Sequence, residues 1–189
     1  MRRDRGFTVT ELLVAVGMVG ILATVAIWEI NRTMPDYRVG AGASRFLLDL
    51  RSTAAIAART NRPAIFRVIP NQVDCDFRYR IEQDETVYLD VCLSDEYRRV
   101  VPVDELAEIR CQEEELLGLD PLPSCSLCEG GAIVFFPTGE VQGSEPVGDT
   151  LVLRSEEREG GLVRAVGLRA GGIGRARIYQ WDGGAWQCR

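Results

Sequence analysis

The pattern of apolar and polar residues divides the chain into three regions. Residues 12–28 run without a charge, and an apolar run of about 17–25 residues is typical of a helix that crosses a membrane. Residues 39–58 repeat apolar side chains with the period of a helix that buries one face. From Ala64 the period changes to two, which is typical of half-buried strands. The pattern therefore predicts an α+β fold, with a long N-terminal helix followed by antiparallel β-sheet.

The second part of the predicted helix has one apolar face. This stripe consists of Val39, Ala43, Phe46, Leu47, Leu50, Ala54, Ala57 and Ala58. Four charged residues lie largely off the stripe and are expected at the surface, namely Arg45, Asp49, Arg51 and Arg59. Pro35 removes a helical hydrogen bond, so we expect a kink or an interruption near residues 31–36. Asn61 and Pro63 predict the end of the helix.

The strand region begins with a predicted hairpin. We expect a strand at residues 64–69, a turn at 70–71, a second strand at 73–81 and its partner at 86–93, after a polar tip at 82–85. Further strands are expected at residues 132–136, 150–154, 162–169 and 174–181. Residues 94–130 form an acidic, cysteine-rich insertion in which 103–117 could hold a short helix. The insertion is expected to be solvated, and the alternative is a recognition surface for a neighbouring subunit or a basic partner.

Two registers of the first hairpin are open. Pairing Ile81 with Thr86 places Cys75 opposite Cys92, close enough for a disulfide. Pairing Ile81 with Val87 separates the cysteines and aligns the apolar faces. Because a shift of one residue turns every side chain to the other face, only one register can be correct. We favour the register that aligns the apolar faces.

Six cysteines lie beyond the apolar run, at positions Cys75, Cys92, Cys111, Cys125, Cys128 and Cys188. An even number of cysteines in an extracytoplasmic domain predicts structural disulfides, whose connectivity the sequence leaves open. Cys125 and Cys128 form a C-x-x-C that could alternatively be half of a zinc site or a redox pair. No second C-x-x-C accompanies it, so we expect disulfides and no metal.

The composition argues against an enzyme. The chain has no histidine, which removes the commonest general base and every histidine-containing zinc site. A dinucleotide-binding fingerprint and a phosphate-binding loop are also absent from the sequence. The formal net charge of −6 disfavours non-specific coating of nucleic acid. We therefore expect a non-catalytic protein without a cofactor.

The last predicted strand carries a second candidate surface. Because side chains alternate along a strand, one face holds Arg175, Arg177, Tyr179 and Trp181. Arginines beside aromatic rings can bind single-stranded nucleic acid. The alternative, which we favour, is an exposed sheet face on which the arginines stack on the rings for stability.

The N-terminus carries the most specific motif. A charged leader ends at Gly6, and Glu11 is the only acid near the start of the apolar run. A carboxylate at the edge of hydrocarbon is unfavourable without a partner, so Glu11 is a candidate functional residue. A cut between Gly6 and Phe7 would create an α-amine that could neutralise Glu11 in neighbouring copies. A secretory signal fits less well, because no A-x-A-like site follows Trp28.

This stretch closely resembles the class III signal of type IV pilins and type II secretion pseudopilins. The matching residues are Gly6, Phe7, Thr8, Glu11, Leu12 and Leu13. The resemblance implies that a prepilin peptidase cuts after Gly6 and methylates Phe7, and that Glu11 acts in subunit assembly. It also implies a leader at residues 1–6, a transmembrane and filament-core helix at 7–34 and a periplasmic head at 35–189.

The C-terminal part is similar to H-type pseudopilins and to FimT/FimU-type minor pilins. The matching residues are Phe135, Pro137, Gly139, Leu151, Leu153, Val166, Gly174, Arg175 and Arg177. The resemblance implies a low-copy pilin of the inner membrane that primes or caps a filament. Its implied partners are major and minor pilins, the peptidase and a tip adhesin. The alternatives are an H-type pseudopilin and a minor pilin that binds DNA in transformation.

Overall fold

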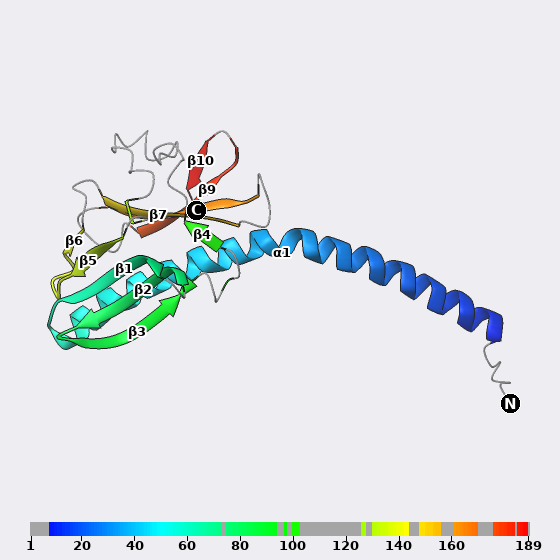
Figure 1. The fold of residues 1–189 in the computed structure, drawn as a ribbon, viewed down its shortest axis with the longest axis horizontal. Coiled ribbons are helices and arrows are strands. Elements are labelled where there is room, and N and C mark those ends of the chain that lie inside the picture. The colour runs from blue at the N-terminus through cyan, green and yellow to red at the C-terminus, as the bar shows by residue number, and fades with distance from the viewer. Residues whose placement is uncertain are drawn as a thin grey trace, which may run out of the picture. The chain divides into compact units, whose positions relative to one another are not determined.

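The structure of the protein is a computed structural model (Figure 1). It describes residues 8–72, 75–93, 97, 100–102, 126–127, 130–143, 148–155, 161–169, 176–183 and 185–188. By its internal contacts the chain forms two compact units, Met1–Met34 and Pro35–Arg189.

One helix, α1 (Val9–Thr60), contributes to both units. Pro35 lies inside α1, so the predicted interruption of the helix near this residue does not occur. The last helical residue is Thr60, and Asn61 adopts a left-handed conformation with φ 53°. The N–H of Arg62 then donates to the carbonyl oxygen of Ala57 at 3.3 Å. The predicted end of the helix is confirmed.

Within the second unit, α1 buries one face against sheet. The buried residues are Pro35, Val39, Gly42, Ala43, Phe46, Leu47, Asp49, Leu50, Thr53 and Ala57. Six of the eight residues of the predicted stripe are buried, whereas Ala54 is only half-buried. Four residues outside the prediction are buried as well, namely Pro35, Gly42, Asp49 and Thr53. Ala58 is exposed, and Asp49, which was expected at the surface, is only 6% exposed. Asp49 is buried because a tyrosine of the sheet reaches its carboxylate.

The first sheet is antiparallel and has the strand order β3-β2-β1-β5-β6. Its strands are β1 (Ala64–Gln72), β2 (Cys75–Gln83), β3 (Thr86–Cys92), β5 (Gly131–Phe135) and β6 (Val141–Gln142). In Figure 1, β1, β2 and β3 lie beside the C-terminal part of α1. The predicted turn at residues 70–71 is wrong, because β1 continues to Gln72 and Pro70 pairs with Phe77.

Neither predicted register of the β2–β3 hairpin is correct. The tip is the pair Asp84 and Glu85, which have φ values of 47° and 67°, as a two-residue hairpin turn requires. Gln83 therefore pairs with Thr86, and a bulge beyond Glu82 brings Ile81 opposite Leu89. The bulge adds one residue to β3 and thereby aligns the apolar faces of the two strands.

The second sheet is also antiparallel and has the order β10-β9-β8-β7-β4. Its strands are β4 (Val100–Pro102), β7 (Gly148–Ser155), β8 (Val163–Arg169), β9 (Ala176–Trp181) and β10 (Trp186–Cys188). Strands overlap all four ranges predicted for the last third of the chain. The short strands β4, β6 and β10 were not predicted. β4 lies in the range expected to be a solvated insertion, yet it pairs with β7, and Leu127 of the same range is only 1% exposed. The described parts of residues 94–130 therefore belong to the fold, which corrects that expectation. The helix expected at 103–117 lies outside the described residues.

The aromatic core of the second unit joins α1 to the first sheet. The ring of Phe46 lies 5.1 Å from Phe66 and 5.4 Å from Tyr79, both in edge-to-face geometry. Phe66 and Tyr79 stack on each other at 5.0 Å. All three side chains are fully buried, and such pairs add about 0.5–1.5 kcal/mol each beyond area burial. The prediction of an α+β fold, with a long N-terminal helix and antiparallel sheets, is confirmed.

Candidate functional site

The predicted processing site is only partly within the described residues. Gly6 and Phe7 lie outside them, and the description begins at Thr8. Thr8 is the residue before α1, and Glu11 lies in the first helical turn. The arrangement of these two side chains therefore shows how the helix starts next to the predicted cleavage site.

Thr8 and Glu11 form a reciprocal cap at the start of α1. The backbone N–H and the hydroxyl of Thr8 both donate to Oε2 of Glu11 at 3.0 Å, and the N–H of Glu11 donates to Oγ1 of Thr8 at 3.2 Å. This is a capping box, in which two backbone donors that a helix start leaves unpaired are satisfied by side chains. Glu11 thus has a structural role within one chain. The T-x-x-E spacing of Thr8 and Glu11 is the sequence signal for this cap, which was not among the predicted roles of Glu11.

The first part of α1 exposes apolar side chains all round. The exposed large residues are Val9, Leu12, Leu13, Val14, Val16, Met18, Val19, Ile21, Leu22, Val25, Ile27, Trp28 and Ile30. By length and composition this segment could cross a membrane. An apolar surface of this size needs lipid or other apolar helices around it.

An aromatic residue ends the apolar run, and a basic residue follows one helical turn later. The guanidinium of Arg32 lies over the ring of Trp28, with Cζ 5.7 Å from the ring centroid. Trp28 is 63% exposed. The two residues are one helical turn apart, so they lie on the same face of α1.

The candidate nucleic-acid surface on β9 is incomplete in the structure. Arg177 is exposed, whereas Tyr179 is fully buried. Trp181 is half-buried and its ring lies 5.3 Å from that of Trp186. Arg175 lies outside the described residues. A buried Tyr179 offers no ring on which a base could stack, so the arrangement gives little support to nucleic-acid binding.

Two of the predicted disulfide cysteines are bonded to each other. Cys75 and Cys92 form a disulfide with a Cα–Cα distance of 5.9 Å. In the sheet Cys92 pairs with Arg78 and not with Cys75. The disulfide therefore joins two residues that do not face each other directly, at the end of the hairpin opposite its turn. Cys188 is also disulfide-bonded. The remaining three cysteines, Cys111, Cys125 and Cys128, lie outside the described residues.

A buried polar cluster joins α1 to β2. The hydroxyl of Tyr79 donates to Oδ2 of Asp49 at 2.7 Å, and Nε of Arg45 donates to the same oxygen at 2.9 Å. Burial, followed by the hydrogen bond to Asp49, raises the pKa of Tyr79 far above its usual range. The Asp49 carboxylate also raises the pKa of Arg45. The cluster fixes the position of the helix on the sheet, since a displaced helix would leave a buried carboxylate without its donors.

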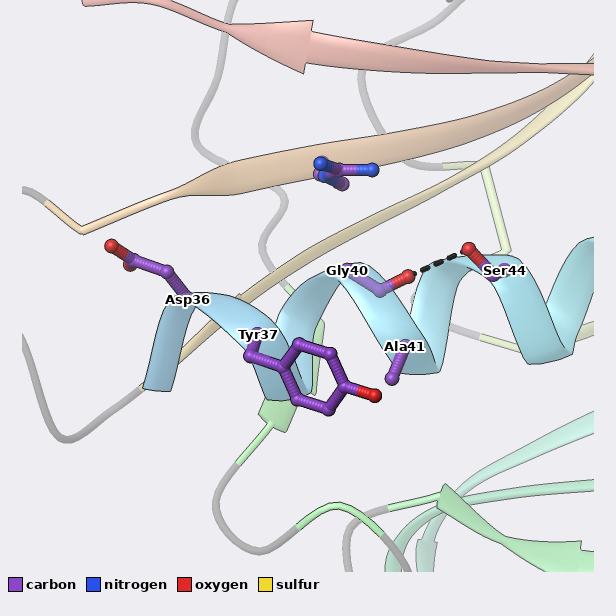
Figure 2. Close-up of a pocket in the computed structure, with 6 residues that line it drawn as sticks. Asp36, Tyr37, Gly40, Ala41 and Ser44 are labelled. Atoms are coloured by element: carbon purple, nitrogen blue, oxygen red, sulfur yellow. Dashed lines mark hydrogen bonds between the residues drawn. The ribbon is translucent and has the colours of Figure 1, made fainter. Parts of the chain in front are cut away.

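A hollow lies beside α1 in the second unit (Figure 2). It has a volume of about 410 Å³ and is lined by Asp36, Tyr37, Gly40, Ala41, Ser44 and Arg164. Asp36 accepts a hydrogen bond from the N–H of Leu162 at 2.9 Å, which ties the helix to the start of β8. A Cβ on Gly40 would lie 3.5 Å from Cζ of Arg164. The hollow therefore exists because small residues line this face of α1.

The described residues hold no apparent catalytic or metal centre. Within those parts of the chain, no three or more Asp, Glu or Cys side chains gather as a metal site. Many of the polar contacts found there join neighbouring elements of the fold, such as the ion pair of Arg80 with Asp90 at 2.8 Å. The remaining candidate features are the capped start of α1, the apolar surface of its first part, and the pair formed by Trp28 and Arg32.

The comparison with known proteins concerns this same segment. Residues 1–27 match the family model of the prokaryotic N-terminal methylation motif. Neither the curated proteins nor the solved structures give a match to the chain. The motif spans the predicted leader, the Thr8 and Glu11 cap and most of the apolar run. The chain thus carries an N-terminal methylation motif of the type IV prepilin kind, which supports a type IV pilin-like protein or a pseudopilin.

Proposed function

We propose that this protein is a low-copy structural subunit of a type IV pilus, which primes or caps filament assembly. One observation carries the proposal: the N-terminal methylation motif at residues 1–27 is continuous with a helix whose apolar side chains are exposed on every side. In the membrane these side chains face lipid, and in a filament they face the helices of other subunits. The same surface therefore serves both states of the subunit.

Processing converts the first state into the second. A prepilin peptidase cuts between Gly6 and Phe7 and methylates the new N-terminus. The new N-terminal amine of Phe7 then lies close to a neighbouring subunit, and the Glu11 carboxylate of that subunit forms an ion pair with it. A subunit docked at the wrong height would leave this carboxylate unpaired in an apolar bundle, which is costly. Glu11 in this way selects the axial position of the subunit.

The low copy number rests on the acidic segment at residues 94–130. A subunit repeated along a whole filament must pack against identical copies on all sides. The net negative charge of this segment on each copy would repel the same charge on its neighbours. A subunit that occupies one position at the tip avoids this repulsion, and the acidic residues of the segment then contact a neighbouring minor pilin or a tip adhesin.

The test is to shear surface filaments from cells and compare them with the envelope fraction by mass spectrometry. We expect a peptide that begins at N-methylated Phe7 in the sheared fraction, at a level far below that of the major subunit. In cells carrying Gly6→Ala we expect the chain to keep Met1 and to stay in the envelope. Detection of unprocessed Met1 in both fractions of wild-type cells would contradict the proposal.

A pseudopilus is the alternative assembly, because it uses the same N-terminal segment. In that case the processed peptide stays in the envelope fraction. Deletion of the gene then stops the export of secreted enzymes and leaves surface filaments unchanged. An equal abundance of this chain and the major subunit along sheared filaments would instead contradict the low-copy role.

A further inference from the structure

Trp28 and Arg32 present a combined aromatic and cationic surface at the end of the apolar run. The distance of 5.7 Å from Cζ of Arg32 to the ring centroid places the cation over the ring face. Trp28 is 63% exposed, so apart from its contact with Arg32 most of this side chain is open among the described residues. The pair is therefore free to meet a partner outside the chain. Glu29 is the first charge after the run and lies between the two residues in sequence.

The position of this pair along α1 matches the thickness of one bilayer. A helix rises about 1.5 Å per residue, so Arg32 lies about 31 Å along the axis from Glu11. The hydrocarbon core of a bilayer is about 30 Å thick. The residues from Leu12 to Trp28 carry no charge. When Glu11 lies at one boundary of the hydrocarbon, Arg32 therefore lies at the other.

We propose that Trp28 and Arg32 form an interfacial anchor that binds the phosphate groups of membrane lipids and fixes the depth of α1 in the bilayer. This inference rests on the proposed function, since it requires residues 12–28 to span a membrane. An indole ring prefers the headgroup level because it is apolar and also carries an N–H donor. A guanidinium binds phosphate through paired hydrogen bonds, and its apolar stem lies along the helix.

The anchor determines where Glu11 lies before assembly. With the C-terminal end of the span held at the phosphate level, Glu11 is kept at the opposite boundary, beside the peptidase cleavage site. Extraction of the subunit into a filament then requires release of the lipid phosphates from Arg32. The pair thus links the depth of the span to the readiness of the subunit for processing and extraction.

The test measures the depth of Trp28 in lipid vesicles that contain the full chain. The vesicles consist of phosphatidylcholine and phosphatidylglycerol, with bromine atoms placed either near the headgroup or near the centre of the acyl chains. Bromine quenches a nearby tryptophan, and subtraction of the Trp28→Phe signal removes the other two tryptophans, Trp181 and Trp186. Flotation of the vesicles through a density gradient first shows whether the chain is inserted.

We expect the Trp28 signal to be quenched most by the bromines near the headgroup. Arg32→Leu removes the cation and extends the apolar surface, so the quenching maximum should move towards the centre of the acyl chains. Arg51→Leu removes an exposed arginine from the second unit and should leave the profile unchanged.

Three results would overturn the inference. Quenching of wild-type Trp28 mainly from the bilayer centre would contradict the assigned depth. An unchanged profile in Arg32→Leu would contradict binding of lipid phosphate by Arg32. A chain that does not float with the vesicles would contradict both the anchor and the proposed function. The first two results contradict the anchor alone, so the two failures can be distinguished.

Discussion

At the scale of single residues, the hydrogen bond from Tyr79 to Asp49 gives the clearest prediction. Tyr79→Phe removes the hydroxyl and leaves the buried Asp49 carboxylate with Arg45 as its remaining described donor. A hydrogen bond to a charged group contributes about 1.5–3 kcal/mol. We expect a loss of this size in the free energy of unfolding, measured by urea denaturation of the full chain in detergent.

Tyr88→Phe is the matched control for Tyr79→Phe. Its hydroxyl donates to Oε1 of Gln83 at 3.4 Å, and its side chain is 47% exposed. Loss of a long hydrogen bond at the surface should cost less than about 0.5 kcal/mol. Equal losses of unfolding free energy in Tyr79→Phe and Tyr88→Phe would show that the buried hydrogen bond to Asp49 stabilises the protein no more than an exposed one.

The raised pKa of Tyr79 predicts a dependence of stability on alkaline pH. In the folded protein burial and Asp49 hold Tyr79 in its neutral form, whereas in the unfolded chain a tyrosine ionises near pH 10, a value about that of model peptides. The stabilisation is therefore complete below about pH 10 and is lost as the pH rises above it, by about 1.4 kcal/mol per pH unit. The difference in unfolding free energy between wild type and Tyr79→Phe should fall along this slope. A difference independent of pH up to about 11.5, roughly one and a half units above the value for an unperturbed tyrosine, would contradict the shift.

At the scale of elements, the sequence predicted the strands better than the connections between them. Alternation of apolar residues located β2, because one face of this strand is buried and the other is partly exposed. The β2–β3 register was missed because it depends on a two-residue turn at Asp84 and Glu85 and on the bulge that follows. Neither residue is a glycine or an asparagine, so the turn lacked its usual sequence signal. The short strands β6 and β10 have too few residues to show a period.

The disulfide across this hairpin gives a prediction at the same scale. Cys75 and Cys92 are 17 residues apart, and in the chain-entropy account a loop of about that length is stabilised by roughly 3 kcal/mol. Substitution of both cysteines by serine should lower the free energy of unfolding by an amount of this order. The effect should disappear when wild type and variant are compared after complete reduction. A non-reducing tryptic digest should contain one peptide pair joined through Cys75 and Cys92.

At the scale of the whole molecule, the two ends of the chain differ in how well sequence locates the candidate sites. The N-terminal site is local, since Thr8 and Glu11 are three residues apart and their contact follows from helix geometry. The surface proposed on β9 depended on which face of the strand is buried. The alternation placed Tyr179 beside Arg177, but the core takes up Tyr179 and leaves Arg177 exposed. Burial of this kind is decided by the second sheet as a whole, which a single strand does not reveal.

The two roles of Glu11 can be separated in the assembled molecule. Within one chain Glu11 caps α1 through Thr8, and a glutamine at this position can do the same. In a filament, the proposed role needs the negative charge of Glu11 to meet the amine of a neighbouring Phe7. Glu11→Gln should therefore keep the helix start, seen as unchanged amide hydrogen exchange over residues 9–14, and should still be cut after Gly6, but it should be absent from sheared filaments.

Glu11→Ala extends this comparison, since alanine removes both the cap and the charge. It should lose protection of the first helical amides by about fivefold, which corresponds to a cap worth about 1 kcal/mol, and it should be excluded from filaments like Glu11→Gln. If Glu11→Gln enters filaments at the wild-type level while Glu11→Ala does not, the carboxylate acts only as a cap. The charge would then have no part in choosing the axial position of the subunit.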